Sequence, residues 1–135
     1  MDRVYSSNAP EPVGPYSQAV AHGGVLYLSG QVPLDPATGK LCGATIEEQT
    51  EQVLDNLAAV LAAAGIDFSR LLRVGVYLID MSDFPRMNAV YADRLGDARP
   101  ARATVAVAAL PLGARVEIDA IAALPDRADP DRADR

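Results

Sequence analysis

The sequence predicts an α+β fold in which one β-sheet carries two helices on the same face. Two segments with helical periodicity, near residues 45–64 and 83–95, are separated by an apolar strand. Further candidate strands stand before the first helix and after the second. The chain has 135 residues, half of them apolar, which suits a single domain whose core needs neither disulfides nor metal ions.

The first two predicted strands form an antiparallel hairpin, at residues 16–21 and 25–31. The Gly23-Gly24 pair between them is a turn sequence, because glycine adopts the positive φ angles that tight hairpins need. The stretch GPYSQAV therefore places Tyr16 at the start of a strand.

The first helix is predicted from Thr45 to Ala64. Thr45 and Glu48 form a capping box, in which each side chain bonds to the backbone N–H of the other residue, and Gly65 ends the helix. Mostly apolar residues recur every three or four positions and mark the buried face. These are Ile46, Thr50, Val53, Leu54, Leu57, Leu61 and Ala64.

A strand at residues 71–80 follows, and its low polar content predicts a central place in the sheet. The second helix begins after it, with Ser82 or Asp83 as the N-cap, and ends before Gly96. One polar residue, Asn88, stands on the predicted buried face of this helix. That face contains Phe84, Met87, Asn88, Tyr91 and Leu95.

The last two strands are predicted at residues 102–108 and 115–122, joined as a hairpin by the turn ALPLGA. In this register Arg102 and Glu117 share a face but stand about 14 Å apart, at about 3.4 Å per residue. They are either ordinary surface charges, or a second subunit or small polar ligand lies between them. Residues expected on apolar sides are Val105, Val107, Val116, Ile118 and Ala120.

Composition and charge disfavour two kinds of partner. The formal net charge of −6 repels the phosphates of a nucleic acid, and no basic stripe offsets it. No apolar run approaches the about 20 residues of a membrane span, and the N-terminus lacks a secretory signal. We therefore expect a cytoplasmic protein that binds neither nucleic acid nor membrane.

The sequence predicts no metal and no cofactor. His22 is the only histidine and stands beside the predicted hairpin turn, where a solvated role is typical. Cys42 is the single cysteine, so the chain offers too few ligands for a zinc site. It has no glycine-rich phosphate-binding motif, and its one lysine, Lys40, stands in a turn.

Five polar residues stand where apolar ones are expected, and they are the candidate site residues. They are Tyr16, Ser29, Asn88, Arg102 and Glu117. Each also has a structural interpretation: a hydroxyl at the rim of the core, a strand filler, an amide bound to a loop carbonyl, or a cross-strand ion pair. The residues alone leave both interpretations open.

Five stretches of the sequence carry a family resemblance: APEPVGPYSQAV, LYLSGQVPLDPATGK, EEQTEQVLDNLAAVLAAAG, VYLIDMSDFPRMNAVYADRLG and PARATVAVAALPLGARVEIDAIA. They run in order from Ala9 to Ala122 and together resemble the RidA (YjgF) family of reactive-imine deaminases. The resemblance implies a chorismate-mutase-like fold for one domain at 1–124, and a homotrimer with ligand sites between subunits. The charged segment 125–135 lacks apolar residues larger than alanine, so we expect a disordered tail.

The resemblance also implies an activity, the metal-free hydrolysis of reactive 2-imino acids and their enamine tautomers to 2-keto acids and ammonia. Arg102 stands at the position of the family's carboxylate-binding arginine, and Glu117 at that of its water-directing glutamate. The remaining substrate-binding positions correspond to Tyr16, Ser29, Gly30, Asn88 and Thr104.

The sequence departs from the family pattern at two places. Thr104 stands where many relatives carry cysteine, and Val74-Gly75 replaces a threonine-containing run. Three alternative functions stay open: a deaminase for a different enamine or carbamate, a trimer that binds keto acids without catalysis, and an endoribonuclease. The negative charge and the position of His22 disfavour the last one.

Overall fold

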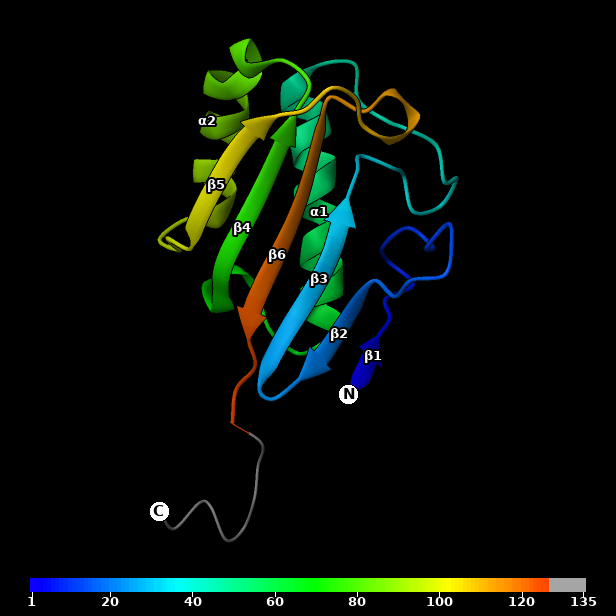
Figure 1. The fold of residues 1–135 in the computed structure, drawn as a ribbon, viewed down its shortest axis with the longest axis vertical. Coiled ribbons are helices and arrows are strands. Elements are labelled where there is room, and N and C mark those ends of the chain that lie inside the picture. The colour runs from blue at the N-terminus through cyan, green and yellow to red at the C-terminus, as the bar shows by residue number, and fades with distance from the viewer. Residues whose placement is uncertain (127–135) are drawn as a thin grey trace, which may run out of the picture.

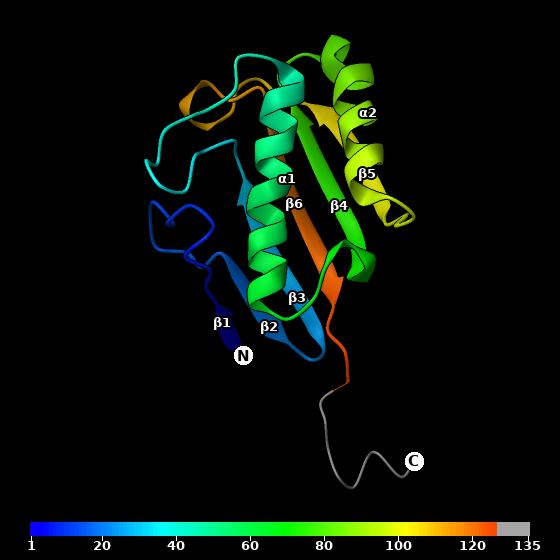
Figure 2. The same cartoon turned by 180° about the vertical axis from the view of Figure 1, so that it is seen from behind.

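In the computed structural model, which describes residues 1–126, six strands form one mixed sheet and two helices cover one of its faces (Figures 1 and 2). This confirms the predicted α+β class. The sheet order is β1-β2-β3-β6-β4-β5. The strands are β1 (Asp2–Val4), β2 (Ala19–His22), β3 (Val25–Gln31), β4 (Leu71–Leu78), β5 (Ala101–Ala106) and β6 (Val116–Ala123), and the helices are α1 (Ile46–Ala63) and α2 (Phe84–Leu95).

Among the residues described, no helix is long and apolar enough to cross a bilayer. The cytoplasmic location stays a prediction. The predicted disordered tail at 125–135 falls, from residue 127 onward, outside the part of the chain that the structure describes.

The hairpin of β2 and β3 is confirmed, with both turn glycines at positive φ. Its first strand is shorter than predicted, because β2 begins at Ala19 and Tyr16 lies in the preceding loop. The side chain of Gln18 explains the late start. It donates to the carbonyls of Ser6 and Pro10, at 3.1 and 3.0 Å, and so ties this segment to the N-terminal loop instead of to a strand.

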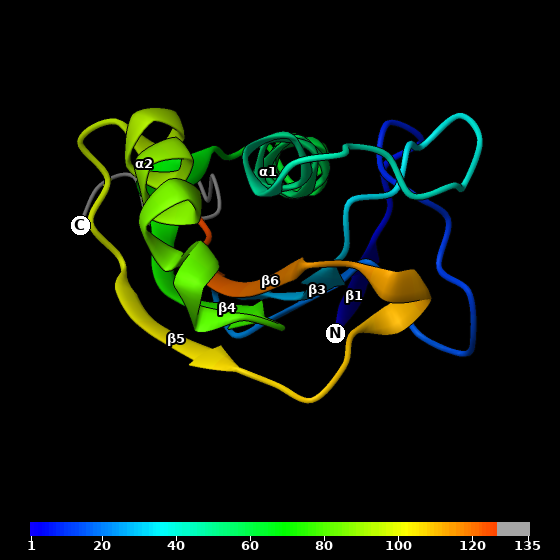
Figure 3. The ribbon, with the colours of Figure 1, turned by 90° about the horizontal axis from the view of Figure 1, so that it is seen from above.

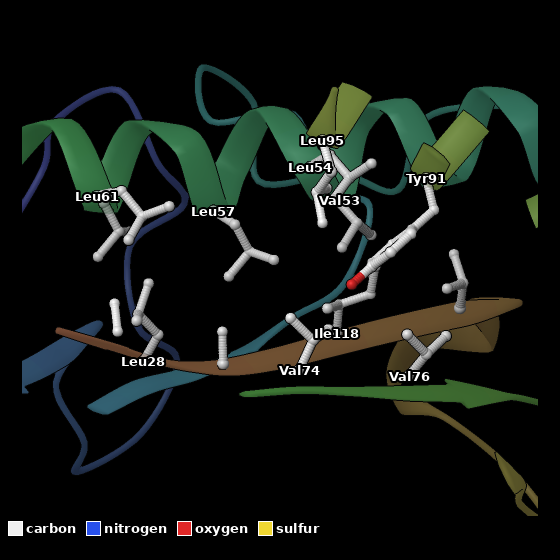
Figure 4. Close-up of a cluster of buried hydrophobic side chains, with 14 of the residues drawn as sticks. Leu28, Val53, Leu54, Leu57, Leu61, Val74, Val76, Tyr91, Leu95 and Ile118 are labelled. Atoms are coloured by element: carbon white, nitrogen blue, oxygen red, sulfur yellow. The ribbon is translucent and has the colours of Figure 1, made fainter. Parts of the chain in front are cut away.

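Helix α1 follows the prediction closely, because its signals are local. Thr45 Oγ1 accepts from the backbone N–H of Glu48 at 3.1 Å, and the Glu48 carboxylate accepts from the N–H of Thr45 at 3.2 Å. Its buried side chains point at the sheet, where they meet those of β3, β4 and β6 (Figure 4). Burying each such leucine or valine stabilises the fold by about 1.5–3 kcal/mol.

Helix α2 begins where predicted, with Asp83 at the N-cap position, but the cap is made differently. Neither Ser82 nor Asp83 caps the helix through its side chain. A short 3₁₀ turn precedes the helix, and Asp80 caps that turn by accepting from the N–H of Ser82 at 2.9 Å. Asp83 is instead buried, with an exposed fraction of 3%, and forms an ion pair with Arg115 at 2.8 Å.

The predicted hairpin of the last two strands is wrong. Strand β4 lies between them, pairing parallel with β5 and antiparallel with β6. Helix α2 is the crossover that connects β4 to β5, and a crossover through a helix produces parallel neighbours. The chain then passes over the end of β4, through residues 107–115, and returns between β3 and β4 as β6 (Figure 1).

Both helices lie on the same side of the sheet, and within residues 1–126 the opposite side carries no helix (Figure 3). On the covered side, Val116, Ile118 and Ala120 are buried as predicted. Val105 is not, because it lies on the uncovered side and is 45% exposed. Tyr27 on β3 is similarly exposed on that side, at 49%.

Candidate functional site: the Glu117 cavity and the Arg102 pocket

Arg102 and Glu117 lie on opposite faces of the sheet, and not on one face as predicted. Arg102 pairs with Val74 of β4, whose side chain is in the core beneath the helices. Glu117 pairs with Tyr77, three residues further along β4. Since cross-strand partners share a face and successive residues alternate, the two charged side chains point in opposite directions.

Glu117 lies in a cavity of about 400 Å³, here called the Glu117 cavity. Tyr16, Gly30 and Leu112 also line it. The Glu117 carboxylate lies directly over Gly30, because a Cβ on that glycine would stand 2.5 Å from Oε2. The absence of a side chain at residue 30 therefore creates the space that the carboxylate occupies.

Two buried amide side chains hold the loops that form the walls of this cavity. Gln18 accepts from the N–H of Ser6 at 2.6 Å, in addition to its two donated bonds. Asn56 of α1 donates to the carbonyls of Val32 and Leu34 at 3.2 and 3.0 Å. Neither residue was predicted to belong to the site. Their only signal is an amide among apolar neighbours, in SQAV and in LDNLAAV.

Of the two predicted site residues Tyr16 and Ser29, only Tyr16 lines this cavity. Tyr16 is on its rim, 52% exposed, in the loop before β2. The Ser29 hydroxyl donates to the Ser17 carbonyl at 2.6 Å, and its backbone N–H donates to the Gln18 carbonyl at 2.9 Å. Ser29 therefore holds the segment that carries Tyr16.

Burial raises the pKa of Glu117, and the negative charge of Asp119 on the same face of β6 raises it further. Asp119 accepts a hydrogen bond from the Tyr77 hydroxyl at 2.9 Å. A Cβ at Gly75 would collide with both of these groups, so the Gly75 departure makes room for a tyrosine–aspartate pair. Val74 is an ordinary core residue.

Arg102 lines a second depression, here called the Arg102 pocket, between α2 and the start of β5. Its guanidinium carbon lies 4.7 Å from the ring centre of Tyr91 and 5.5 Å from that of Phe84, and Nη1 donates to Asn88 Oδ1 at 2.8 Å. The predicted polar misfit on α2 thus orients Arg102. Arg102 makes no ion pair within residues 1–126, so its remaining N–H groups can bind a carboxylate.

Thr104 follows Arg102 on the same face of β5, opposite Val76. Its Oγ1 is buried and has no hydrogen-bond partner in the described part of the chain. It lines neither the Glu117 cavity nor the Arg102 pocket.

The other reactive side chains lie away from both depressions. His22 is exposed at the β2–β3 turn. The Cys42 thiol donates to Gln52 Oε1 at 3.3 Å, and burial raises its pKa. Within residues 1–126, no three histidine, cysteine or acidic side chains are grouped so that they could hold a metal ion.

Residues 6–124 match the family model described as Endoribonuclease L-PSP, and the matched segment contains both depressions. The chain belongs to the RidA (YjgF) family. This family includes the 2-iminobutanoate/2-iminopropanoate deaminase of Mus musculus, 46% identical over 119 residues that cover 88% of each chain. A RutC family protein of Pyrococcus horikoshii is 48% identical over 119 residues, which are 88% of this chain and 94% of that protein.

The fold is also that of solved RidA structures. The crystal structure of RidA from an Antarctic Psychrobacter superposes with a TM-score of 0.88. The sequences are 41% identical, and the match covers 92% of this chain and 100% of that chain. This RidA-family chain therefore has the family fold along nearly its whole length.

Proposed function

We propose that the protein hydrolyses reactive 2-imino acids and their enamine tautomers to 2-keto acids and ammonia. The observation that carries this proposal is the position of the Glu117 carboxylate, which lies over Gly30 in a largely apolar cavity. Its pKa is raised there by burial. Such a carboxylate can orient and deprotonate a water molecule without a metal. The kinship with the Mus musculus deaminase supports the same reaction.

In the proposed reaction, a water oxygen bonds to the imine carbon while Glu117 accepts the water proton. That proton then passes to nitrogen, which gives a carbinolamine. The hydroxyl proton of the carbinolamine is next transferred to nitrogen, with Glu117 as the carrier, while the carbon–nitrogen bond breaks, so that the carbonyl forms and ammonia leaves. These imines also hydrolyse unaided, so positioning the water and the substrate supplies the acceleration. No covalent nucleophile is required.

Arg102 is proposed to bind the substrate carboxylate. A guanidinium offers two parallel N–H donors that match a carboxylate, and Asn88 fixes the plane of this one through a 2.8 Å hydrogen bond. The rings of Tyr91 and Phe84 further restrict its rotation. Arg102 is therefore oriented before the substrate arrives.

Because Arg102 and Glu117 point to opposite faces of the sheet, one chain cannot apply both groups to one small substrate. We propose that the site forms between two copies, with Glu117, Gly30 and Tyr16 from one and Arg102 with Asn88 from the next. The uncovered sheet face supports association, because exposed Val105 and Tyr27 lie on it without a covering helix. Closed cyclic symmetry repeats the site at each interface, as in a homotrimer.

The test is imine decay. A pyridoxal-phosphate dehydratase generates 2-aminoacrylate in place, and semicarbazide traps the imine that remains. We expect faster decay with wild type, and no acceleration with Arg102→Ala or Glu117→Gln, both of which should keep the oligomer. Retained rates in both variants would refute the assigned roles.

The same experiment separates the alternatives. A folded oligomer that binds 2-ketobutyrate tightly but does not accelerate decay would be a metabolite-binding protein. A folded oligomer that neither binds 2-ketobutyrate nor accelerates imine decay would favour a different enamine or a carbamate as the substrate.

A further inference from the structure

Leu112 has a backbone conformation that favours glycine. It lies in the 3₁₀ turn Pro111–Gly113 before β6, at φ 58° and ψ 21°. It is the only residue other than glycine with positive φ in the described chain. A side chain in this region is strained against its own backbone, and such strain clusters at ligand sites.

The leucine side chain gains little from the core in return, since it is 67% exposed. Glycine at the same position would remove the strain, and the next residue, Gly113, shows that this turn accommodates glycine. The fold of one chain therefore gives no reason for a leucine at residue 112.

The position of Leu112 in the site suggests a reason. It lines the Glu117 cavity, and Val13, Val32 and Leu34 form the other apolar parts of the same wall. The only ionisable groups in that lining besides the Tyr16 hydroxyl are Glu117 and Glu11, and both are acidic. A cavity of about 400 Å³ is within the range of about 300–1,000 Å³ in which proteins bury small ligands. The smallest imino acids would leave part of this apolar space unfilled.

We propose that Leu112 is a specificity-determining residue, which contacts the side chain of the substrate and selects 2-imino acids with apolar side chains larger than methyl. This inference rests on the proposed function. With the reacting carbon beside Glu117 and the carboxylate on Arg102 of the partner subunit, the third substituent enters the apolar part of the cavity. The two carboxylates repel an anionic side chain there.

The test compares two imines. A flavin amino-acid oxidase, with O₂ as its oxidant and catalase to remove peroxide, generates the imino acids of alanine and leucine in place. Semicarbazide trapping gives kcat/KM for each, and their ratio is the readout. The variants are Leu112→Gly, which removes the side chain, and Leu112→Asn, which keeps a similar size and tolerates positive φ but is polar.

We expect wild type to favour the leucine-derived imine, and both variants to lower the ratio at least about tenfold, the usual effect of losing an apolar contact in a pocket. Val13 lies in the same apolar wall and has no backbone strain, so Val13→Ala should also lower the ratio. This variant keeps the test valid if the two variants of the turn unfold. Unchanged ratios would overturn the inference while leaving the deaminase intact. No acceleration of either imine by wild type would overturn both.

Discussion

Arg102 and Glu117 lie on opposite faces of one sheet, with β4 between their strands. If each site takes one of these residues from each of two copies, two inactive variants can restore each other. Arg102→Ala and Glu117→Gln should each be inactive alone. Mixed oligomers, formed by co-expression or by unfolding and refolding together, should recover about one quarter of the wild-type rate, because random assembly joins the two intact halves at that frequency.

The control is to mix the two variants after folding under conditions in which subunits do not exchange. No recovery in the co-refolded sample would place the complete site within one chain.

The pH dependence of the reaction should report the raised pKa of Glu117. The ionised carboxylate is the form that accepts a proton from water, so kcat/KM should fall on acidification at a higher pH than for an ordinary glutamate. Asp119→Asn removes the neighbouring negative charge and still accepts the Tyr77 hydrogen bond. Its acid limb should move to lower pH in a profile of kcat/KM, and an unmoved limb would exclude Asp119 as a cause of the shift.

The same pKa shift predicts that Glu117 lowers stability at neutral pH. A group whose pKa is higher in the folded state binds its proton more tightly there, so its contribution to stability is complete below the unfolded pKa. It is lost as pH rises through the folded pKa. Glu117→Gln should therefore raise Tm at pH 7, and thermal melts should show the gain shrinking on acidification. A lower Tm at pH 7 would contradict the burial cost.

Gly30→Ala tests whether the position of the carboxylate matters. The added Cβ would lie 2.5 Å from Glu117 Oε2, so the carboxylate must move, and we expect kcat/KM to fall at least about tenfold. Gly75→Ala is the matched control, because its Cβ crowds Asp119 and Tyr77 on the same face instead. Equal losses in the two variants would indicate general crowding of the sheet.

Asp83 provides a prediction on stability alone. Its carboxylate is nearly inaccessible and pairs with Arg115 at 2.8 Å and with Arg86 at 3.3 Å. Asp83→Asn should lower the free energy of unfolding by about 1–3 kcal/mol, since a buried charge-assisted interaction is lost. Glu51→Gln, at the less buried ion pair with Arg94, should cost at most about 1 kcal/mol. Urea denaturation measures both, and equal costs would mean that burial of Asp83 adds nothing.

Sequence reasoning succeeded where the determinants are local. The capping box of Thr45 and Glu48, the apolar face of α1 and the turn at Gly23-Gly24 each depend on residues a few positions apart, and the structure confirms all three. It found the N-cap position of Asp83 but not the role of the carboxylate, because an aspartate is equally suited to a side-chain cap. The carboxylate instead pairs with the distant Arg115, which the fold brings beside it, and with Arg86, three residues along the chain.

The sequence by itself determined the fold class, both helices, every strand except β1, and the identity of the polar residues that stand out from the core pattern. The tertiary structure decided the order of the strands, and with it the face that each polar residue occupies. The physical reason is that alternation along a strand fixes only relative directions, while the helix crossover sets β5 parallel to β4 and leaves β6 between β3 and β4. That arrangement separates Arg102 from Glu117.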